Sequence, residues 1–173
     1  ARPNATVTVK TSWNGQTYKF SSDGKGGWSL TVSTPVAGGP YKIIFNDGEL
    51  LTLQNVLIGE VWFCSGQSNM EMPMGCFDRQ PVRGANDIIA KAKPSTPIRM
   101  YTTDSKDGRW VRQFSKTPAE DCQGEWLENT PVNVSHISAV SYYFARYIQE
   151  VLEVPVGIVV STWGGSRIEA WMS

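Results

Sequence analysis

The stretch Gly59-Glu-Val-Trp-Phe-Cys-Ser-Gly-Gln-Ser-Asn-Met70 joins a short apolar run to a polar turn. Val61 to Cys64 is typical of a buried strand that breaks at Ser65-Gly66, and Ser68 follows in the sharp turn. Hydrolases place a nucleophile at such a corner, because it projects past the sheet edge and nearby backbone N–H groups stay free to bind an oxyanion. Ser, Gly and Asn are also common turn formers, so a plain polar turn is the alternative interpretation.

A second segment, which runs from Pro155 to Trp171, has the same arrangement. Val156 to Val160 is apolar and strand-like, and Gly164-Gly165-Ser166 follows as a loop in which the backbone can approach another group closely. A tight turn with no catalytic part is the alternative interpretation of the two glycines. Both segments thus consist of an apolar strand followed by a loop of small residues.

Length and composition limit the classes of function. The 173 residues are enough for one domain with a substantial core. Lys+Arg and Asp+Glu both number 16, so the chain has no electrostatic footprint for nucleic acid or an anionic membrane. No apolar run approaches the roughly 20 residues that span a bilayer. We therefore expect no nucleic-acid partner and no membrane span. No signal peptide is visible, which indicates a mature or a cytosolic chain.

The cysteines and the glycosylation sequons say little about the compartment. Cys64 lies in the apolar strand and is expected to be a buried thiol, whereas Cys76 and Cys122 lie in polar sequence and are candidates for a disulfide that spacing cannot establish. The chain has no Cys-x-x-Cys motif and no histidine cluster, so we expect no structural zinc site. The sequons Asn4-Ala-Thr6 and Asn133-Val-Ser135 favour a secreted glycoprotein.

Residues 1–57 have the pattern of an all-β module. Short runs with strand-like alternation or β-rich composition occupy residues 5–10, 16–20, 28–32, 41–45 and 50–53. Asn46-Asp47-Gly48 separates the last two runs and is a strong hairpin signal. We expect a small β-sandwich here, incomplete at its N-terminus.

From residue 58 onward the pattern changes to α/β. Strands are expected at residues 61–64, 98–102 and 156–160, and helices at residues 86–93 and 138–152, with a loop-rich stretch at residues 104–135. In the second helix the apolar residues recur at 3.6-residue spacing. The order strand, crossover, strand predicts a parallel sheet with helices on its faces.

The motifs Gly66-Gln-Ser-Asn-Met70 and Trp163-Gly-Gly-Ser-x-Ile-Glu-Ala-Trp171 resemble those of the sialate O-acetylesterase family. That family belongs to the SGNH (GDSL-like) hydrolases and is related to some acetyl xylan esterases. The resemblance also covers residues 37–41, 56–62 and 137–140, so it extends over nearly the whole chain. It implies a three-layer α/β/α core of the SGNH type over residues 58–173, incomplete in this chain and preceded by the β-sandwich-like module.

The resemblance also assigns roles at the site. Ester hydrolysis by a serine requires a nucleophile, a base, a group that orients the base, and donors for the oxyanion. Ser68 matches the family's nucleophile, and its backbone N–H is implied to join the oxyanion hole. Gly164 matches the glycine whose N–H supplies a second donor, with Gly165 as the alternative. The implied activity is removal of O-acetyl groups from a carbohydrate, with sialic acid as the first candidate and with no cofactor or metal.

The base is the missing part. His136 is the only histidine, and it does not match the family's catalytic histidine, which lies in an Asp-x-x-His segment near the C-terminus. That segment does not occur in this chain, and no Gln-Gly-Glu block follows Gly164, where the family has one between this glycine and the histidine. We therefore expect a second polypeptide or a C-terminal remainder to supply the histidine and aspartate, and the chain alone to be inactive. His136 is expected to be a surface or helix-capping residue.

Two further hypotheses and two polar residues stay open. The chain is alternatively part of an acetyl xylan esterase or related polysaccharide deacetylase, or it is a noncatalytic carbohydrate-binding or structural fragment. Glu71 is a candidate for orienting a base, although a structural ion pair is the commoner outcome. Arg167 is a candidate for attracting a carboxylate such as that of sialic acid. The resemblance implies a secreted, periplasmic or lysosomal protein.

Overall fold

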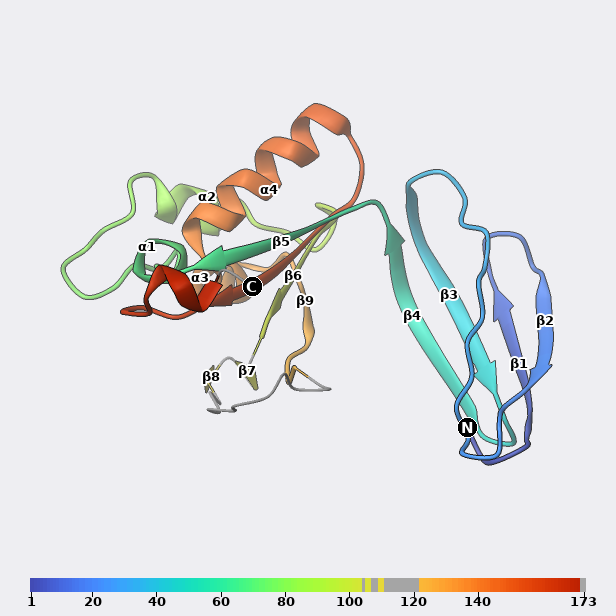
Figure 1. Cartoon of the computed structure of the whole chain (residues 1–173). Coiled ribbons are helices and arrows are strands. Elements are labelled where there is room, and N and C mark those ends of the chain that lie inside the picture. Colours follow the sequence, from blue (N-terminus) through green and yellow to red (C-terminus); the bar gives the residue numbers. More distant parts are fainter. Residues whose placement is uncertain (104, 107–108, 111–121, 172–173) are drawn as a thin grey trace. The chain divides into compact units, whose positions relative to one another are not determined.

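The computed structural model describes residues 1–103, 105–106, 109–110 and 122–171 (Figure 1). The chain divides into two compact units, Ala1–Gly59 and Glu60–Ser173. The first unit contains one antiparallel sheet, and the second contains a mixed sheet with helices. The chain is therefore a mixed α/β protein with two principal sheets, and each unit is best understood from its own strands.

The sheet of the first unit has the strand order β2-β1-β3-β4, and every neighbouring pair is antiparallel. Its strands are β1 (Thr6–Thr11), β2 (Thr17–Ser21), β3 (Gly38–Asn46) and β4 (Leu50–Ile58). The alternation along β1 buries Val7 and Val9 on one face and leaves Lys10 exposed on the other, as the period of two predicts. The predicted hairpin is also present, because β3 and β4 meet at the turn that follows Asn46.

Residues 28–32 are not the strand that their composition predicted. They belong to the irregular segment between β2 and β3, in which the Trp28 ring packs against Phe20 and Phe45 at centroid distances of 5.3 and 5.9 Å. The ring thus packs against side chains of two strands, β2 and β3, while its own segment lies outside the sheet. Residues 1–59, all of which the structure describes, form one sheet, so a two-sheet sandwich stays a prediction.

The sheet of the second unit has the strand order β5-β10-β6-β9. Its strands are β5 (Glu60–Gly66), β6 (Ile98–Thr102), β9 (Trp126–Glu128) and β10 (Val156–Thr162). β5, β10 and β6 run parallel, and β9 pairs antiparallel with β6. The short strands β7 (Ser105–Lys106) and β8 (Arg109–Trp110) form a separate antiparallel pair. The predicted parallel arrangement is confirmed for the strands on which the candidate motifs lie.

The helices of this unit differ widely in length. They are α1 (Ser68–Glu71), α2 (Ala85–Lys91), α3 (Pro131–His136), α4 (Ala139–Leu152) and the 3₁₀ helix η1 (Ile168–Trp171). Ser138 caps α4, because its side chain accepts a hydrogen bond from the Ser141 N–H at 3.3 Å. The buried face of α4 includes Tyr142 and Ala145, which pack in the core with Ile158 of β10.

Four elements lie in the stretch that was expected to be loop-rich, namely β7, β8, β9 and α3, which extends one residue beyond it. α3 begins after Thr130, whose side chain accepts from the Asn133 N–H at 3.3 Å, and Pro131 occupies the first helical turn. A capping threonine followed by proline is a recognised helix start, so the sequence did contain the signal. β9 spans only three residues, which is too short for a periodic pattern to reveal. α2 also begins and ends earlier than predicted, at Ala85 and Lys91.

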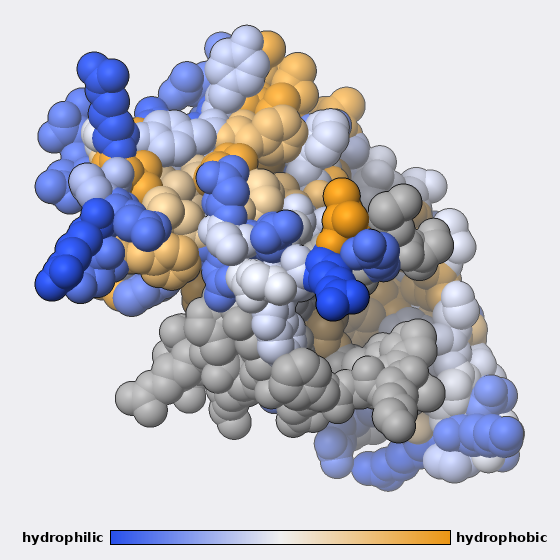
Figure 2. Space-filling model, turned by 60° about the vertical axis from the view of Figure 1, so that its left-hand side comes forward, coloured by the Kyte–Doolittle hydropathy of each residue, from blue (hydrophilic) through white to orange (hydrophobic). Residues whose placement is uncertain are grey.

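β5 is the edge strand of its sheet and not the buried strand that its apolar run predicted. Val61 and Phe63 are 65% and 67% exposed, since no neighbouring element of the described chain covers their face. Apolar side chains on α4 are exposed as well, including Tyr147 and Val151. Figure 2 shows apolar side chains at the surface beside hydrophilic ones. The three-layer SGNH arrangement therefore stays a prediction for this unit.

Candidate active site

Ser68 lies where the sheet of the second unit stops. β5 ends at Gly66, and Ser68 is the first residue of the single helical turn α1. The turn is closed by hydrogen bonds from the Glu71 N–H to the Gln67 carbonyl at 3.0 Å and from the Met72 N–H to the Ser68 carbonyl at 3.1 Å. Ser68 is exposed. The structure thus has the strand–turn–helix corner that the sequence predicted around the candidate nucleophile.

The loop Gly164-Gly165-Ser166, called the Gly-Gly loop below, follows β10 and lies directly beside this corner. β5 and β10 are parallel neighbours, and Gly66 pairs in register with Thr162. The Trp163 N–H extends this pairing by donating to the Gly66 carbonyl at 2.9 Å. Because parallel strands end at the same edge of a sheet, the loops that follow them meet there. Two motifs nearly a hundred residues apart are brought together in this way.

Gly164 approaches Ser68 so closely that a side chain on Gly164 would fill the gap between them. A Cβ built on Gly164 would lie 3.5 Å from Ser68 Oγ and 2.5 Å from Glu71 Oε2. The Gly164 N–H donates a hydrogen bond to the carboxylate of Glu71, a half-buried residue on the same helical turn as Ser68. The need for glycine at this position therefore comes from the closeness of two other side chains.

The backbone N–H groups around Ser68 differ in whether they already donate a hydrogen bond. The Gly164 N–H is engaged by Glu71, whereas the N–H groups of Ser68 and Gly165 form no hydrogen bond within the part of the chain that the structure describes. An oxyanion hole requires preorganised donors that are not already occupied. The sequence alone did not predict that Glu71 would occupy this N–H group. The role of Gly164 as an oxyanion donor stays a prediction.

Comparisons with known proteins find relatives of one kind. No family model matches the chain. It is 29% identical to the sialate O-acetylesterases of Homo sapiens and Mus musculus, over 99% of its own length and 34% and 32% of theirs. A carbohydrate acetylesterase from Xanthomonas citri of known structure superposes on the whole chain with a TM-score of 0.85 and 34% identity, and 37% of that protein is covered.

The chain belongs to the sialate O-acetylesterase family. It spans about a third of the length of the curated relatives that it matches. The match includes both candidate loops, since it covers 99% of the chain.

His136 is not placed as a sialate O-acetylesterase base would have to be. It is an exposed residue in the last turn of α3, and it forms no hydrogen bond with Ser68 in the described structure. The neighbouring backbone is used structurally, because the Ile137 carbonyl accepts from the Met74 N–H at 2.9 Å. His136 is thus a surface residue at a helix end.

The three cysteines form no disulfide in the described structure, so Cys76 and Cys122 are not paired there. Cys64, Cys76 and Cys122 are free thiols; the first is half-buried and the others are exposed. In residues 1–103, 105–106, 109–110 and 122–171 no cluster of three or more His, Cys, Asp or Glu side chains is arranged to hold a metal ion. Among the described helices there is no candidate for a membrane-spanning segment.

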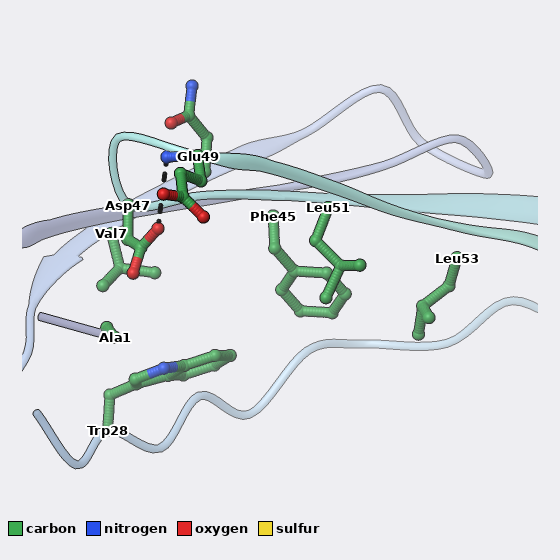
Figure 3. Close-up of a pocket in the computed structure, with 9 residues that line it drawn as sticks. Ala1, Val7, Trp28, Phe45, Asp47, Glu49, Leu51 and Leu53 are labelled. Atoms are coloured by element: carbon green, nitrogen blue, oxygen red, sulfur yellow. Dashed lines mark hydrogen bonds between the residues drawn. The ribbon is translucent and has the colours of Figure 1, made fainter.

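The first unit contains a cavity of about 350 Å³ on the apolar side of its sheet. Figure 3 shows Phe45, Leu51 and Leu53 pointing from the sheet toward the segment that carries Trp28. Asp47 and Glu49 lie at one end of this cavity. An aromatic ring beside carboxylates suits a sugar, so this cavity is the feature that the noncatalytic hypothesis would use.

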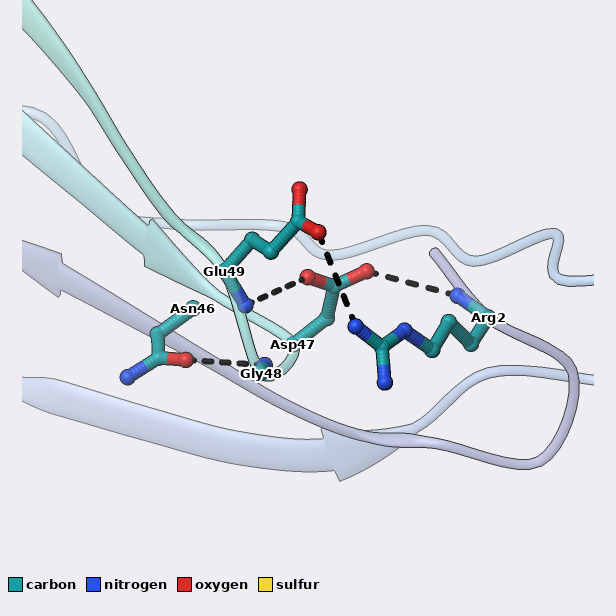
Figure 4. Close-up of polar contacts among 5 residues, drawn as sticks. All are labelled: Arg2, Asn46, Asp47, Gly48 and Glu49. Carbon is teal, nitrogen blue, oxygen red and sulfur yellow. Dashed lines mark hydrogen bonds and ion pairs between the residues drawn. The ribbon is translucent and has the colours of Figure 1, made fainter.

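The polar groups at the end of that cavity are already bonded within the hairpin turn (Figure 4). Asp47 accepts hydrogen bonds from the N–H groups of Glu49 and Arg2, both at 3.3 Å, and the Glu49 carboxylate pairs with the Arg2 guanidinium at 3.6 Å. The Glu49 N–H, and to a lesser degree the Arg2 N–H, holds the pKa of Asp47 below its ordinary value. These contacts stabilise the turn, and the corner at Ser68 is the better candidate site.

Proposed function

We propose that this chain carries the nucleophile of a serine-dependent carbohydrate O-acetylesterase. The observation behind the proposal is the corner after β5. Ser68 is exposed there, and the Gly164 backbone lies so close that a Cβ built on it would be 3.5 Å from Ser68 Oγ. The names of the relatives, sialate O-acetylesterase and carbohydrate acetylesterase, support an acetylated sugar as the substrate.

In the proposed reaction Ser68 Oγ attacks the acetyl carbonyl while a histidine takes up the hydroxyl proton. That histidine and its orienting aspartate come from sequence outside this chain. The tetrahedral oxyanion accepts hydrogen bonds from the Ser68 N–H and from an N–H of the Gly164–Gly165 loop. When the intermediate collapses, the bond between the acetyl carbon and the sugar oxygen breaks, and that oxygen takes the proton from the histidine to leave as a hydroxyl. Water then hydrolyses the acetyl-enzyme, which releases acetate and restores Ser68. The steps use no metal or organic cofactor.

An O-acetylated sialic acid is the first candidate substrate. Arg167 is exposed and lies two residues after Gly165, so its guanidinium is available for the carboxylate that sialic acid carries. A charge-assisted hydrogen bond of this kind is worth about 1.5–3 kcal/mol, or roughly ten- to a hundredfold in catalytic efficiency. Neutral acetylated sugars would not gain from this interaction.

An acetylated plant polysaccharide such as acetyl xylan is the second candidate. The support for this candidate is the structural neighbour, which is 34% identical and is described by the broader term carbohydrate acetylesterase. The substitution Arg167→Ala separates the two candidates. It should lower kcat/KM for acetylated sialic acid and leave acetyl xylan hydrolysis unchanged if sialic acid is the substrate.

The central experiment compares Ser68→Ala with Ser65→Ala in the complete protein. Ser65 is an exposed serine in β5, so its substitution is a matched control. We expect Ser68→Ala to abolish acetate release and covalent labelling by a fluorophosphonate, and Ser65→Ala to retain both. Acetate release by Ser68→Ala at the wild-type rate would contradict the nucleophile assignment.

The complete protein is proposed to act outside the cytosol, in a secreted, periplasmic or lysosomal compartment.

The isolated 173-residue chain is expected to release no acetate, because His136 does not reach Ser68. Adding the polypeptide that carries the Asp-x-x-His segment should restore activity. Full activity of the isolated chain would show that another group serves as the base.

A further inference from the structure

Glu71 connects the two loops of the candidate site. Glu71 and Ser68 are three residues apart on α1, which places their side chains on one side of the helical turn. The Glu71 carboxylate accepts the Gly164 N–H from the loop after β10, across 93 residues of sequence. The contact is therefore a polar link between the Gly-Gly loop and the helical turn that carries Ser68.

We propose that Glu71 is a positioning residue, which acts through Gly164 to hold the Gly-Gly loop at a fixed distance from Ser68. The proposal deepens the esterase function above and rests on it. It makes the Gly164 N–H an anchor and leaves the Gly165 N–H, which has no partner within the described residues, as the loop's donor to the substrate.

The charges at the site support this division of roles. If the Gly164 N–H also served the oxyanion, two negative groups would compete for one donor and repel each other at close range. If Glu71 stays bonded to Gly164, its charge is partly balanced by that N–H and the neighbouring amide is free for the substrate. The hydrogen bond to Glu71 then keeps Gly164 close to Ser68. A Cβ built on Gly164 would lie 3.5 Å from Ser68 Oγ.

Glu71 meets two geometric requirements that such an anchor has. Its carboxylate is near enough to Gly164 that a Cβ there would lie 2.5 Å from Oε2, so the contact does not depend on a water molecule. Glu71 is also half-buried, which restricts the alternative rotamers of its side chain. An exposed glutamate would exchange this contact for solvent.

The test uses Glu71→Gln, Glu71→Asp and Glu71→Ala in the complete esterase. Gln keeps an oxygen that can accept the Gly164 N–H, whereas Asp keeps the charge but is one methylene too short to reach. Asp87→Ala removes an exposed carboxylate from α2 and serves as the matched control. Because two variants shorten the side chain, the test does not depend on whether Glu71→Ala folds.

We expect Glu71→Gln to keep kcat within about threefold of wild type, and Glu71→Ala and Glu71→Asp to lose about a hundredfold, as misplaced active-site groups do. KM should change far less than kcat. The proposal is overturned if Glu71→Ala keeps the wild-type kcat. It is also overturned if Glu71→Gln is as slow as Glu71→Ala, or if Glu71→Ala is faster than wild type, since Glu71 would then act through its charge or as a competitor.

Hydrogen exchange at the Gly164 amide gives a readout that needs no activity. We expect protection of this amide in wild type and Glu71→Gln, and loss of protection in Glu71→Ala and Glu71→Asp. A protein without any esterase activity would refute the proposed function, yet the exchange pattern would still decide whether Glu71 anchors the loop. Equal protection in all four proteins would refute the anchor while leaving the esterase function intact.

Discussion

Gly66 and Thr162 are the last residues paired between the parallel strands β5 and β10. The chain beyond Gly66 forms the turn of Ser68, and the chain beyond Thr162 forms the Gly-Gly loop. The Trp163 N–H adds one more hydrogen bond, to the Gly66 carbonyl at 2.9 Å. This register decides which loop residue faces the candidate nucleophile, because a shift of one residue would present Trp163 or Gly165 in place of Gly164.

Substituting Gly66 by alanine should destabilise the protein and distort the corner. Gly66 has a φ of +146°, and a Cβ there would lie 2.8 Å from Met70 Cγ. A residue held in such a backbone region costs about 1–3 kcal/mol. Denaturant unfolding of Gly66→Ala should show a loss of that size. Gly24→Ala is the control, since Gly24 has no atom within 4 Å of a built Cβ, and a loss there of equal size would contradict the explanation.

Substituting Gly164 by alanine should impair the reaction more than the fold. The new Cβ would lie 2.5 Å from Glu71 Oε2, so the carboxylate must leave the Gly164 N–H, and the methyl group would crowd Ser68 Oγ. We expect kcat to fall by about a hundredfold, as for other misplaced reacting groups. Steady-state kinetics and a melting curve separate the two effects. An unchanged kcat would mean that the loop does not approach the reacting carbonyl.

Tyr142→Phe should destabilise the second unit. The Tyr142 hydroxyl, in a side chain only 2% exposed, donates to Asn129 Oδ1 at 2.6 Å, and Asn129 Nδ2 donates to the Lys93 carbonyl at 3.1 Å. Removing the hydroxyl leaves a buried acceptor without its donor, which costs about 1–3 kcal/mol. Tyr147→Phe, at a 65% exposed tyrosine, is the control and should stay within about 0.5 kcal/mol of wild type. Equal free energies of unfolding for the two variants would exclude the buried network as the cause.

Stability should fall at alkaline pH because of the same tyrosine. Burial raises the pKa of Tyr142 above its ordinary value of 10.0, against the opposing effects of the Arg146 charge and the Asn129 hydrogen bond. The folded state therefore keeps this proton at pH values where the unfolded chain loses it. The contribution is complete below pH 10 and is lost above it, by up to about 1.4 kcal/mol per pH unit. Unfolding at several pH values should show a smaller alkaline loss for Tyr142→Phe, and identical slopes would contradict the assignment.

Local patterns in the sequence were sufficient where the local chain determines the structure. The 3.6-residue spacing predicted α4 and the Asn-Asp-Gly signal predicted the β3–β4 turn, because helix faces and hairpin turns are encoded by neighbouring residues. They failed at residues 28–32 and at β5. At residues 28–32 the structure depends on the packing of Trp28 against Phe20 and Phe45. The exposure of β5 depends on its place at the edge of the sheet.

The sequence by itself determined the chemistry that is available. It placed Ser68 after an apolar strand and a pair of glycines after another, and it showed that the single histidine does not match the expected base. Only the tertiary structure decided which groups meet. The pairing of Gly66 with Thr162 and the hydrogen bond from Gly164 to Glu71 join residues more than ninety positions apart. No local propensity encodes such a contact, because it forms only when parallel strands align their carboxyl ends at one edge of the sheet.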